Sequence, residues 1–187
     1  SEDEWVLDLV PTAWKGDPKK LNEGKIHVCS STWFVGTANN DDSTFTITDK
    51  VYDRAMPIEL NERADEFECD LQPHCDITAE HLQKAKVEHP ISEESLEKMQ
   101  KLDNYLVTRF KLSFGNRIMK QMYDFIPVYV ACGGTELGGM DYIIARKVLK
   151  KFESMNVTFV RDEITGLIKY IDKTFGAAEM EDSKNYL

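Results

Sequence analysis

Apolar residues recur at helical spacing along most of the second half of the chain. Between residues 92 and 110 they stand three or four positions apart, at Leu96, Met99, Leu102, Leu106 and Phe110. That spacing places them on one face of an α-helix, and Ser92 is a residue type that caps helix N-termini. A long amphipathic helix is therefore predicted to begin after Ser92.

The same period predicts helices on either side of this one. Thr78 can cap the N-terminus of a helix that runs to about residue 89, before the one at Ser92. Pro127 lies within the next predicted helix and should kink or interrupt it, because proline lacks an amide hydrogen and crowds the preceding turn. The predicted spans are about 78–89, 118–132, 136–153 and 159–175.

The first 60 residues show shorter patterns. Residues 25–29 and 33–37 are strand candidates, and with Ser30-Ser31 between them they could form a hairpin or one bent strand. Residues 48–54 resemble a short helix. Residues 57–60 alternate in period two and predict a further strand, with Pro57 at its first position.

Residues 61–76 are polar and acidic and fit neither pattern, so a domain boundary is placed there. The predicted organisation is a β-containing part at 1–62, a linker at 63–76 and a helical bundle at 77–187. Three short strands cannot bury both faces of a sheet by themselves. We therefore predict a mainly α chain with a small β part, of α+β class, whose sheet belongs to a larger one.

Composition narrows the possible functions. The 187 residues are 42% apolar and 30% charged, which suffices for a packed core. A formal net charge of −10 argues against a dedicated nucleic-acid or anionic-membrane surface. No apolar run approaches the ~18 residues of a membrane span, and no secretion signal is expected. The four cysteines are then expected to be reduced thiols in the cytoplasm.

No complete catalytic centre can be recognised. The phosphate-binding pattern GxxxxGK[ST] does not occur, and the glycine pairs at 133–134 and 138–139 lack the lysine that should follow. No apolar run ends in the acidic pair of a Walker B motif. GxSxG, HExxH and paired CxxC motifs are also missing from the sequence.

One stretch nevertheless resembles a known family. Gly36-Thr37-Ala38-Asn39-Asn40-Asp41-Asp42 is similar to the sensor-1 segment of McrB-like AAA+ ATPases, with its GTxN(x)xDxS pattern. In register with it, Asp49 to Arg54 resembles the D-x-A-L-x-R segment that ends at the arginine finger. Residues 58–60 resemble the last strand of that family's sheet. Phe114-Gly115-Asn116-Arg117 looks like sensor 2, and residues 140–149 resemble the closing helix of the lid.

The resemblance implies an incomplete AAA+ P-loop NTPase core followed by a helical lid. It assigns catalytic roles to Asn39, which would orient the attacking water, and to Arg54, which would reach a neighbouring subunit's nucleotide. It assigns a nucleotide-binding role to Arg117. The cofactor it implies is ATP or GTP with Mg²⁺, bound by the full-length protein, and the partners are other subunits of a ring.

Each of these residues also has a structural interpretation. Asn39 can be a turn asparagine that satisfies its own backbone. Arg54 can pair with nearby aspartates or with helix carbonyls, and it is the only basic residue where the family usually has more than one. Arg117 can be an exposed helix arginine that pairs with Asp124 or a glutamate. Asn40 and the two aspartates after it are read as loop or capping residues.

Two further clusters carry candidate chemistry. Cys69, His74 and Cys75 could supply three zinc ligands, but no fourth ligand stands at a recognised spacing, so no metal site is predicted. Lys147, Lys150 and Lys151 form a basic cluster on one helix, which we interpret as a solvated face.

The sequence thus predicts a fragment of an AAA+ NTPase that is catalytically inactive by itself, because the phosphate cradle and the metal ligands are missing from these residues. The parent protein would act in nucleic-acid restriction, remodelling or defence, on a nucleic-acid or protein substrate. The alternative is a non-enzymatic interaction module that keeps a lid-like helical bundle for binding a partner protein.

Overall fold

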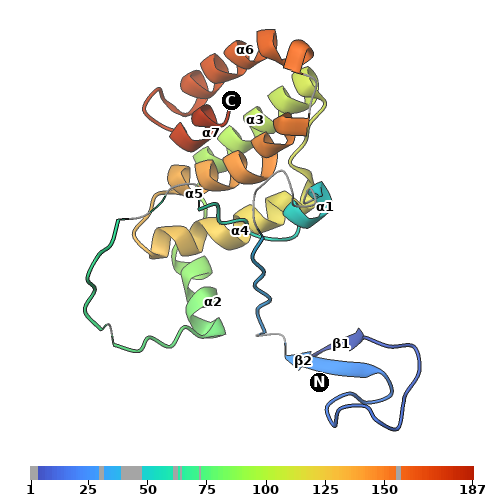
Figure 1. Cartoon of the computed structure of the whole chain (residues 1–187). Helices are drawn as coiled ribbons and strands as arrows, with labels where there is room; N and C mark the ends of the chain where they lie inside the picture. Colours follow the sequence, from blue (N-terminus) through green and yellow to red (C-terminus); the bar gives the residue numbers. More distant parts are fainter. Residues whose placement is uncertain are drawn as a thin grey trace. The chain divides into compact units, whose positions relative to one another are not determined.

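Residues 4–29, 32–38, 48–60, 63, 65–71, 73–154 and 157–187 are described by the structure, a computed structural model. Contacts divide the chain into two units, residues 1–45 and 46–187. In the described residues, the first holds a two-stranded antiparallel sheet and the second is helical (Figure 1). The coarse prediction of a mainly helical chain with a small β part is confirmed.

The sheet pairs β1 (Glu4–Asp8) with β2 (Lys25–Cys29), so that Trp5 lies opposite Val28. The strand predicted at 25–29 is confirmed. The strand predicted at 33–37, as part of a hairpin or of one bent strand with 25–29, is wrong, because the described residues 32–38 form no strand. Gly24, directly before β2, has a φ of 77°, a left-handed conformation that suits glycine. The sequence Ser-Ser is not among those that favour a two-residue hairpin turn.

Residues 48–60 belong to the helical unit by their contacts. They begin with α1 (Asp49–Tyr52), which confirms the short helix predicted there. The strand predicted at 57–60 is wrong, because the structure describes these residues as irregular and not as a strand. Period-two alternation indicates an extended backbone but cannot supply the partner that makes it a strand. The domain assignment at 1–62, 63–76 and 77–187 stays a prediction.

Among the described residues, the second unit continues with five helices that overlap the predicted spans and a sixth, at 181–185, that was not predicted. The predicted caps Thr78 and Ser92 are both found at the N-cap positions. The helices are α2 (Ala79–Glu88), α3 (Glu93–Phe110), α4 (Gly115–Ala131), α5 (Glu136–Ile143), α6 (Val157–Phe175) and α7 (Glu181–Asn185). Pro127 does not interrupt α4, which continues to Ala131.

The predicted helix at 136–153 is not α-helical throughout. After α5 the chain forms a π-helical turn, η1 (Ile144–Val148), and then a 3₁₀ stretch, η2 (Leu149–Ser154). Apolar periodicity does not distinguish these hydrogen-bonding patterns, because all three bury the same kind of residue. Short π-helical turns occur often at functional positions, and η1 carries one of the predicted basic residues, Lys147.

The core of the second unit is the apolar face that the sequence predicted. Side chains from α3, α4, α5, η1 and α6 form one buried cluster. Its fully buried members include Met99, Leu102, Leu106, Met122, Ile126, Met140, Ile143, Ile144, Leu149, Leu167 and Ile171. The buried carboxylate of Asp141 accepts hydrogen bonds from the backbone N–H groups of Asp182 and Ser183, and so fixes α7 to α5.

Glu136 joins the starts of α3 and α5. Its Oε2 accepts hydrogen bonds from Ser92 Oγ at 2.7 Å and from Ser95 Oγ at 2.5 Å, and the Ser92 backbone N–H also donates to the carboxylate. Partial burial raises the pKa of Glu136, but the hydrogen bonds from Ser95 and Ser92 outweigh burial and hold the pKa below its ordinary value. The ionised carboxylate is therefore the form that stabilises this junction.

We predict that Glu136→Gln lowers the free energy of unfolding by about 2 kcal/mol at pH 7, because hydrogen bonds to a charged acceptor are lost. The folded pKa lies below the unfolded value of about 4.3, so this stability is present above pH ~4.3 and is lost as the pH falls through the folded pKa. Urea unfolding of both proteins between pH 7 and pH 3 measures the difference. Glu97→Gln, at an exposed pair with Lys101, is the control. A difference that stays constant down to pH 3 contradicts the prediction.

Candidate functional site

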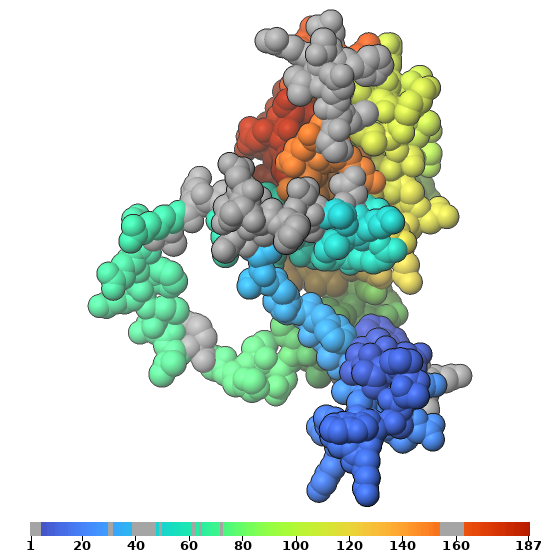
Figure 2. Space-filling model, turned by 45° about the vertical axis from the view of Figure 1, so that its right-hand side comes forward, coloured from blue at the N-terminus to red at the C-terminus, as the bar shows by residue number. Residues whose placement is uncertain are grey.

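Residues 48–60 form a segment that lies along the helical unit, called here the docked segment. It carries Asp53 and Arg54, the end of the predicted arginine-finger motif. Figure 2 shows the cyan part of the docked segment against the surface of the unit. The segment is held by side chains from α4, α5, η1 and η2, which contact its carbonyl groups and its carboxylates.

Lys147 provides the central contact. Its Nζ donates hydrogen bonds to the backbone carbonyls of Tyr52, at 2.6 Å, and of Ala55. The side chain is buried, with the residue 3% exposed. Burial lowers the pKa of Lys147, and the nearby carboxylate of Asp53 opposes that effect. The interpretation of this lysine as part of a solvated face is therefore wrong.

Lys150 and Lys151 also contact the docked segment, contrary to that interpretation. Lys150 Nζ lies 2.6 Å from Glu59 Oε1 and 3.2 Å from the Tyr186 hydroxyl. Burial lowers the pKa of Lys150, but the hydrogen bonds with Glu59 and Tyr186 outweigh burial and raise the pKa above its ordinary value. Lys151 Nζ lies 3.6 Å from Asp53 Oδ1. The basic cluster thus neutralises carboxylates of residues 53–59.

Asp53 lies between cations from two different helices. Its Oδ2 is 3.9 Å from Arg117 Nη1 of α4, while Lys151 of η2 approaches its other oxygen. The backbone carbonyl of Asp53 accepts a hydrogen bond from Gln121 Nε2 at 3.1 Å. Arg117 therefore pairs with Asp53, where the structural interpretation of the sequence had named Asp124 or a glutamate.

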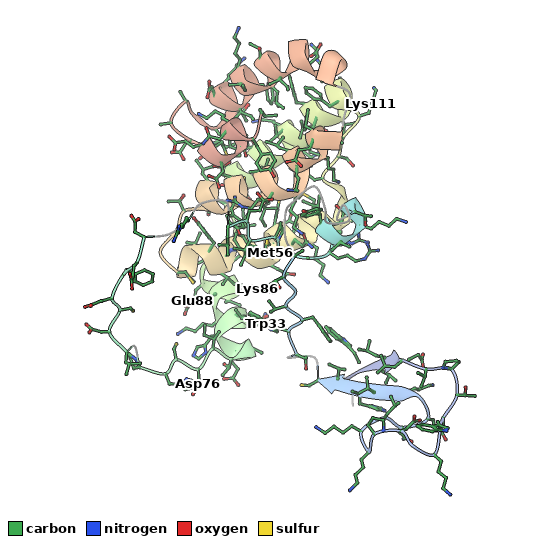
Figure 3. The ribbon with its side chains drawn as sticks, viewed as in Figure 1. Trp33, Met56, Asp76, Lys86, Glu88 and Lys111 are labelled. Carbon is green, nitrogen blue, oxygen red and sulfur yellow. The ribbon has the colours of Figure 1, made fainter. Side chains whose placement is uncertain are left out.

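Arg54 points away from these contacts and is exposed. Its Nη1 donates a hydrogen bond to the backbone carbonyl of Lys50 at 2.6 Å, one of the helix carbonyls considered as its partner. With residues of α4, Arg54 lines an open hollow of about 320 Å³. The other lining residues are Met56, Gln121, Asp124, Phe125 and Val128, and Figure 3 labels Met56 at this position.

The structure thus brings two of the predicted site residues into one region. Arg117 pairs with Asp53, the residue directly before Arg54, whereas the Arg54 side chain itself turns to the carbonyl of Lys50. Each guanidinium group can bind phosphate oxygens in a bidentate geometry. Asn39 lies outside the described residues, and its predicted role stays a prediction.

The cysteine and histidine cluster shows local contacts. His74 Nε2 lies 2.8 Å from Asp76 Oδ1, and Cys69 Sγ donates to the backbone carbonyl of Asp70. Among the residues that the structure describes, no three His, Cys, Asp or Glu side chains are grouped as a metal site. Within the same residues, no helix has the length and apolar character needed to cross a membrane.

Compared with known proteins, the chain matches no protein family, no curated protein and no solved structure.

Sequence reasoning missed the residues that hold the docked segment. Lys147, Lys150 and Lys151 stand at helical spacing, and Asp53 and Glu59 stand six positions apart in the segment. A basic set in one segment and an acidic pair in another are only a weak sign that these two segments contact each other, because charged surface helices usually show the same pattern. The signal was present, but it did not specify a partner.

We predict a coupling energy of about 1 kcal/mol between Lys150 and Glu59, because their side chains are 17% and 27% exposed and solvent screens them little. A double-mutant cycle with Lys150→Met and Glu59→Gln, followed by urea unfolding, measures it. The matched pair Lys101 and Glu97 is 58% and 71% exposed and should couple by about 0.3 kcal/mol. Equal coupling in both cycles would show that Glu59 is not held against η2 in solution.

Proposed function

We propose that this chain is the sensor-1, arginine-finger and lid portion of a McrB-like AAA+ NTPase. The observation that carries the proposal is that Arg117 pairs with Asp53, the residue directly before Arg54, so the two motifs that carry these arginines are in contact. Both arginines were assigned to nucleotide phosphates by motif resemblance alone, and they come from segments far apart in the sequence. In the proposal, Arg117 acts at the nucleotide of its own subunit and Arg54 at that of a neighbour, and the contact through Asp53 links these two roles.

Exposure of the two guanidinium groups also supports the proposal. Arg54 is exposed, and the Arg117 side chain is 52% exposed beside its single carboxylate contact at 3.9 Å. A 3.9 Å ion pair in solvent contributes little to stability, so Arg117 can exchange Asp53 for a phosphate oxygen at small cost. Arg54, held only to a carbonyl of its own helix in the described contacts, can extend towards a neighbouring subunit.

The β1–β2 hairpin fits an incomplete sheet. A two-stranded sheet is marginally stable in water by itself. Trp5 is 53% exposed, Trp33 is 79% exposed, and Val6 and Leu9 are also open to solvent. Apolar side chains at this density call for further strands or helices to cover them. In the proposal, those elements belong to the rest of an AAA+ core.

The roles are divided among residues of this chain and of its parent. Asn39 would orient the attacking water, Arg117 would bind phosphate from the lid of its own subunit, and Arg54 would stabilise charge in a neighbour's site. ATP or GTP with Mg²⁺ would supply the phosphoryl chemistry, bound by a phosphate loop and carboxylates outside this sequence. The proposed setting is a cytoplasmic ring that acts on a nucleic-acid or protein substrate.

We predict that the 187-residue chain alone shows no Mg²⁺-dependent turnover of ATP or GTP, whereas the parent protein does. In the parent, Arg54→Ala and Arg117→Ala should each lower kcat by about 10²-fold or more, because each removes a cation that stabilises transition-state charge. Arg109→Ala is the control, since Arg109 is exposed and pairs with Glu163 at 3.7 Å. Phosphate release under single-turnover and steady-state conditions measures turnover by the isolated chain and by the parent protein with its variants.

Mixing of subunits separates the finger role from a local one. Rings that combine Arg54→Ala subunits with subunits defective in nucleotide binding should regain part of the activity, because an intact finger then faces an intact site. Turnover by the isolated chain that is lost in Arg117→Ala, or a parent without any NTP binding, contradicts the proposal. The latter result favours the non-enzymatic interaction module.

A further inference from the structure

The backbone around Arg54 is held from both sides by one buried side chain. The Lys147 ammonium donates to the carbonyl of Tyr52, two residues before Arg54, and to that of Ala55, directly after it. Gln121 takes the carbonyl between them, that of Asp53. Three carbonyls within four residues thus accept hydrogen bonds from side chains of the helical unit.

An apolar side chain could fill the position of Lys147 but could not make these contacts. Its neighbours along the helix, Ile144 and Val148, are fully buried, and transfer of an ammonium into such surroundings is unfavourable unless it finds acceptors. The acceptors are supplied by the docked segment, and the Asp53 carboxylate adds a favourable charge interaction. The lysine and the segment therefore stabilise each other's position.

From these contacts we infer that Lys147 is a positioning residue for Arg54. It fixes the docked segment to η1, so that Arg54 moves with the helical unit as one body. This inference rests on the proposed function in one respect, the assignment of Arg54 as the finger. If that assignment holds, rotation of the lid in one subunit resets the finger that faces the next subunit's nucleotide.

The anchoring itself can be tested in the chain alone by hydrogen exchange. The amide groups of Val51, Tyr52, Arg54 and Ala55 are hydrogen-bonded within the segment and report on its order. In Lys147→Met their exchange should accelerate at least ~10-fold, while amides of α3 keep their protection. Lys98→Met is the matched control, because the Lys98 side chain is 20% exposed and pairs with Glu94 away from the segment. Unchanged exchange in folded Lys147→Met overturns the inference.

A second measurement needs no variant and covers the case in which Lys147→Met fails to fold. In the wild-type chain, nuclear Overhauser contacts should join the Lys147 side-chain methylene next to Nζ to protons of Tyr52 and Ala55. Their absence in spectra that show the core contacts of Leu102 and Ile143 overturns the inference.

Turnover by the parent protein distinguishes this inference from the proposed function. Lys147→Met should lower kcat with little change in KM, as Arg54→Ala does, because it displaces a residue needed in the transition state. Faster exchange in the chain with unchanged kcat in the parent rejects Arg54 as the finger and leaves the anchoring intact. Unchanged exchange rejects the anchoring, whatever the parent's activity.

Discussion

The candidate site depends on one physical requirement, that the backbone carbonyls at the end of a short helix and a buried ammonium both find partners. In the described part of the chain, residues 48–60 form a short helix, a turn and an irregular stretch but no strand, so no sheet satisfies their carbonyls there. Lys147 is almost completely buried and needs acceptors. Each meets the requirement of the other through the carbonyls of Tyr52 and Ala55. The position of the backbone around Arg54 follows from this pairing.

Charge distribution reinforces the same contact. The chain carries a formal net charge of −10, yet Arg117, Lys147, Lys150 and Lys151 gather on one region of the helical unit. Asp53 and Glu59 supply the opposite charge from the docked segment. The gathering of these cations shows that a chain of acidic net charge can hold a locally basic region, and Asp53 and Glu59 neutralise part of its charge. A net charge describes the whole surface, whereas binding depends on its local arrangement.

A division of roles emerges between the apolar core and the polar contacts. The buried cluster on α3, α4, α5 and α6 fixes the helices, and its described members all lie outside the docked segment. Glu136 and Asp141 then join helix starts within that bundle. The centre of the docked segment is held to the bundle by hydrogen bonds to its carbonyl groups. Such polar contacts are directional and reversible. Such an arrangement lets a functional segment be positioned by the bundle without being part of its core.

Most helices of the second unit could be predicted from the sequence, because helical periodicity and the caps at Thr78 and Ser92 are local signals. The strand at 25–29 and the short helix near 49–52 could be predicted as well, whereas the helix at 181–185 and the π and 3₁₀ turns after Ile143 could not. Which segments pair is a property of the folded chain. The partner of β2 is Glu4–Asp8, residues 57–60 remain without a strand, and the basic cluster is covered by the docked segment. Pairing over long sequence separations depends on the three-dimensional position of both partners, which periodicity does not encode.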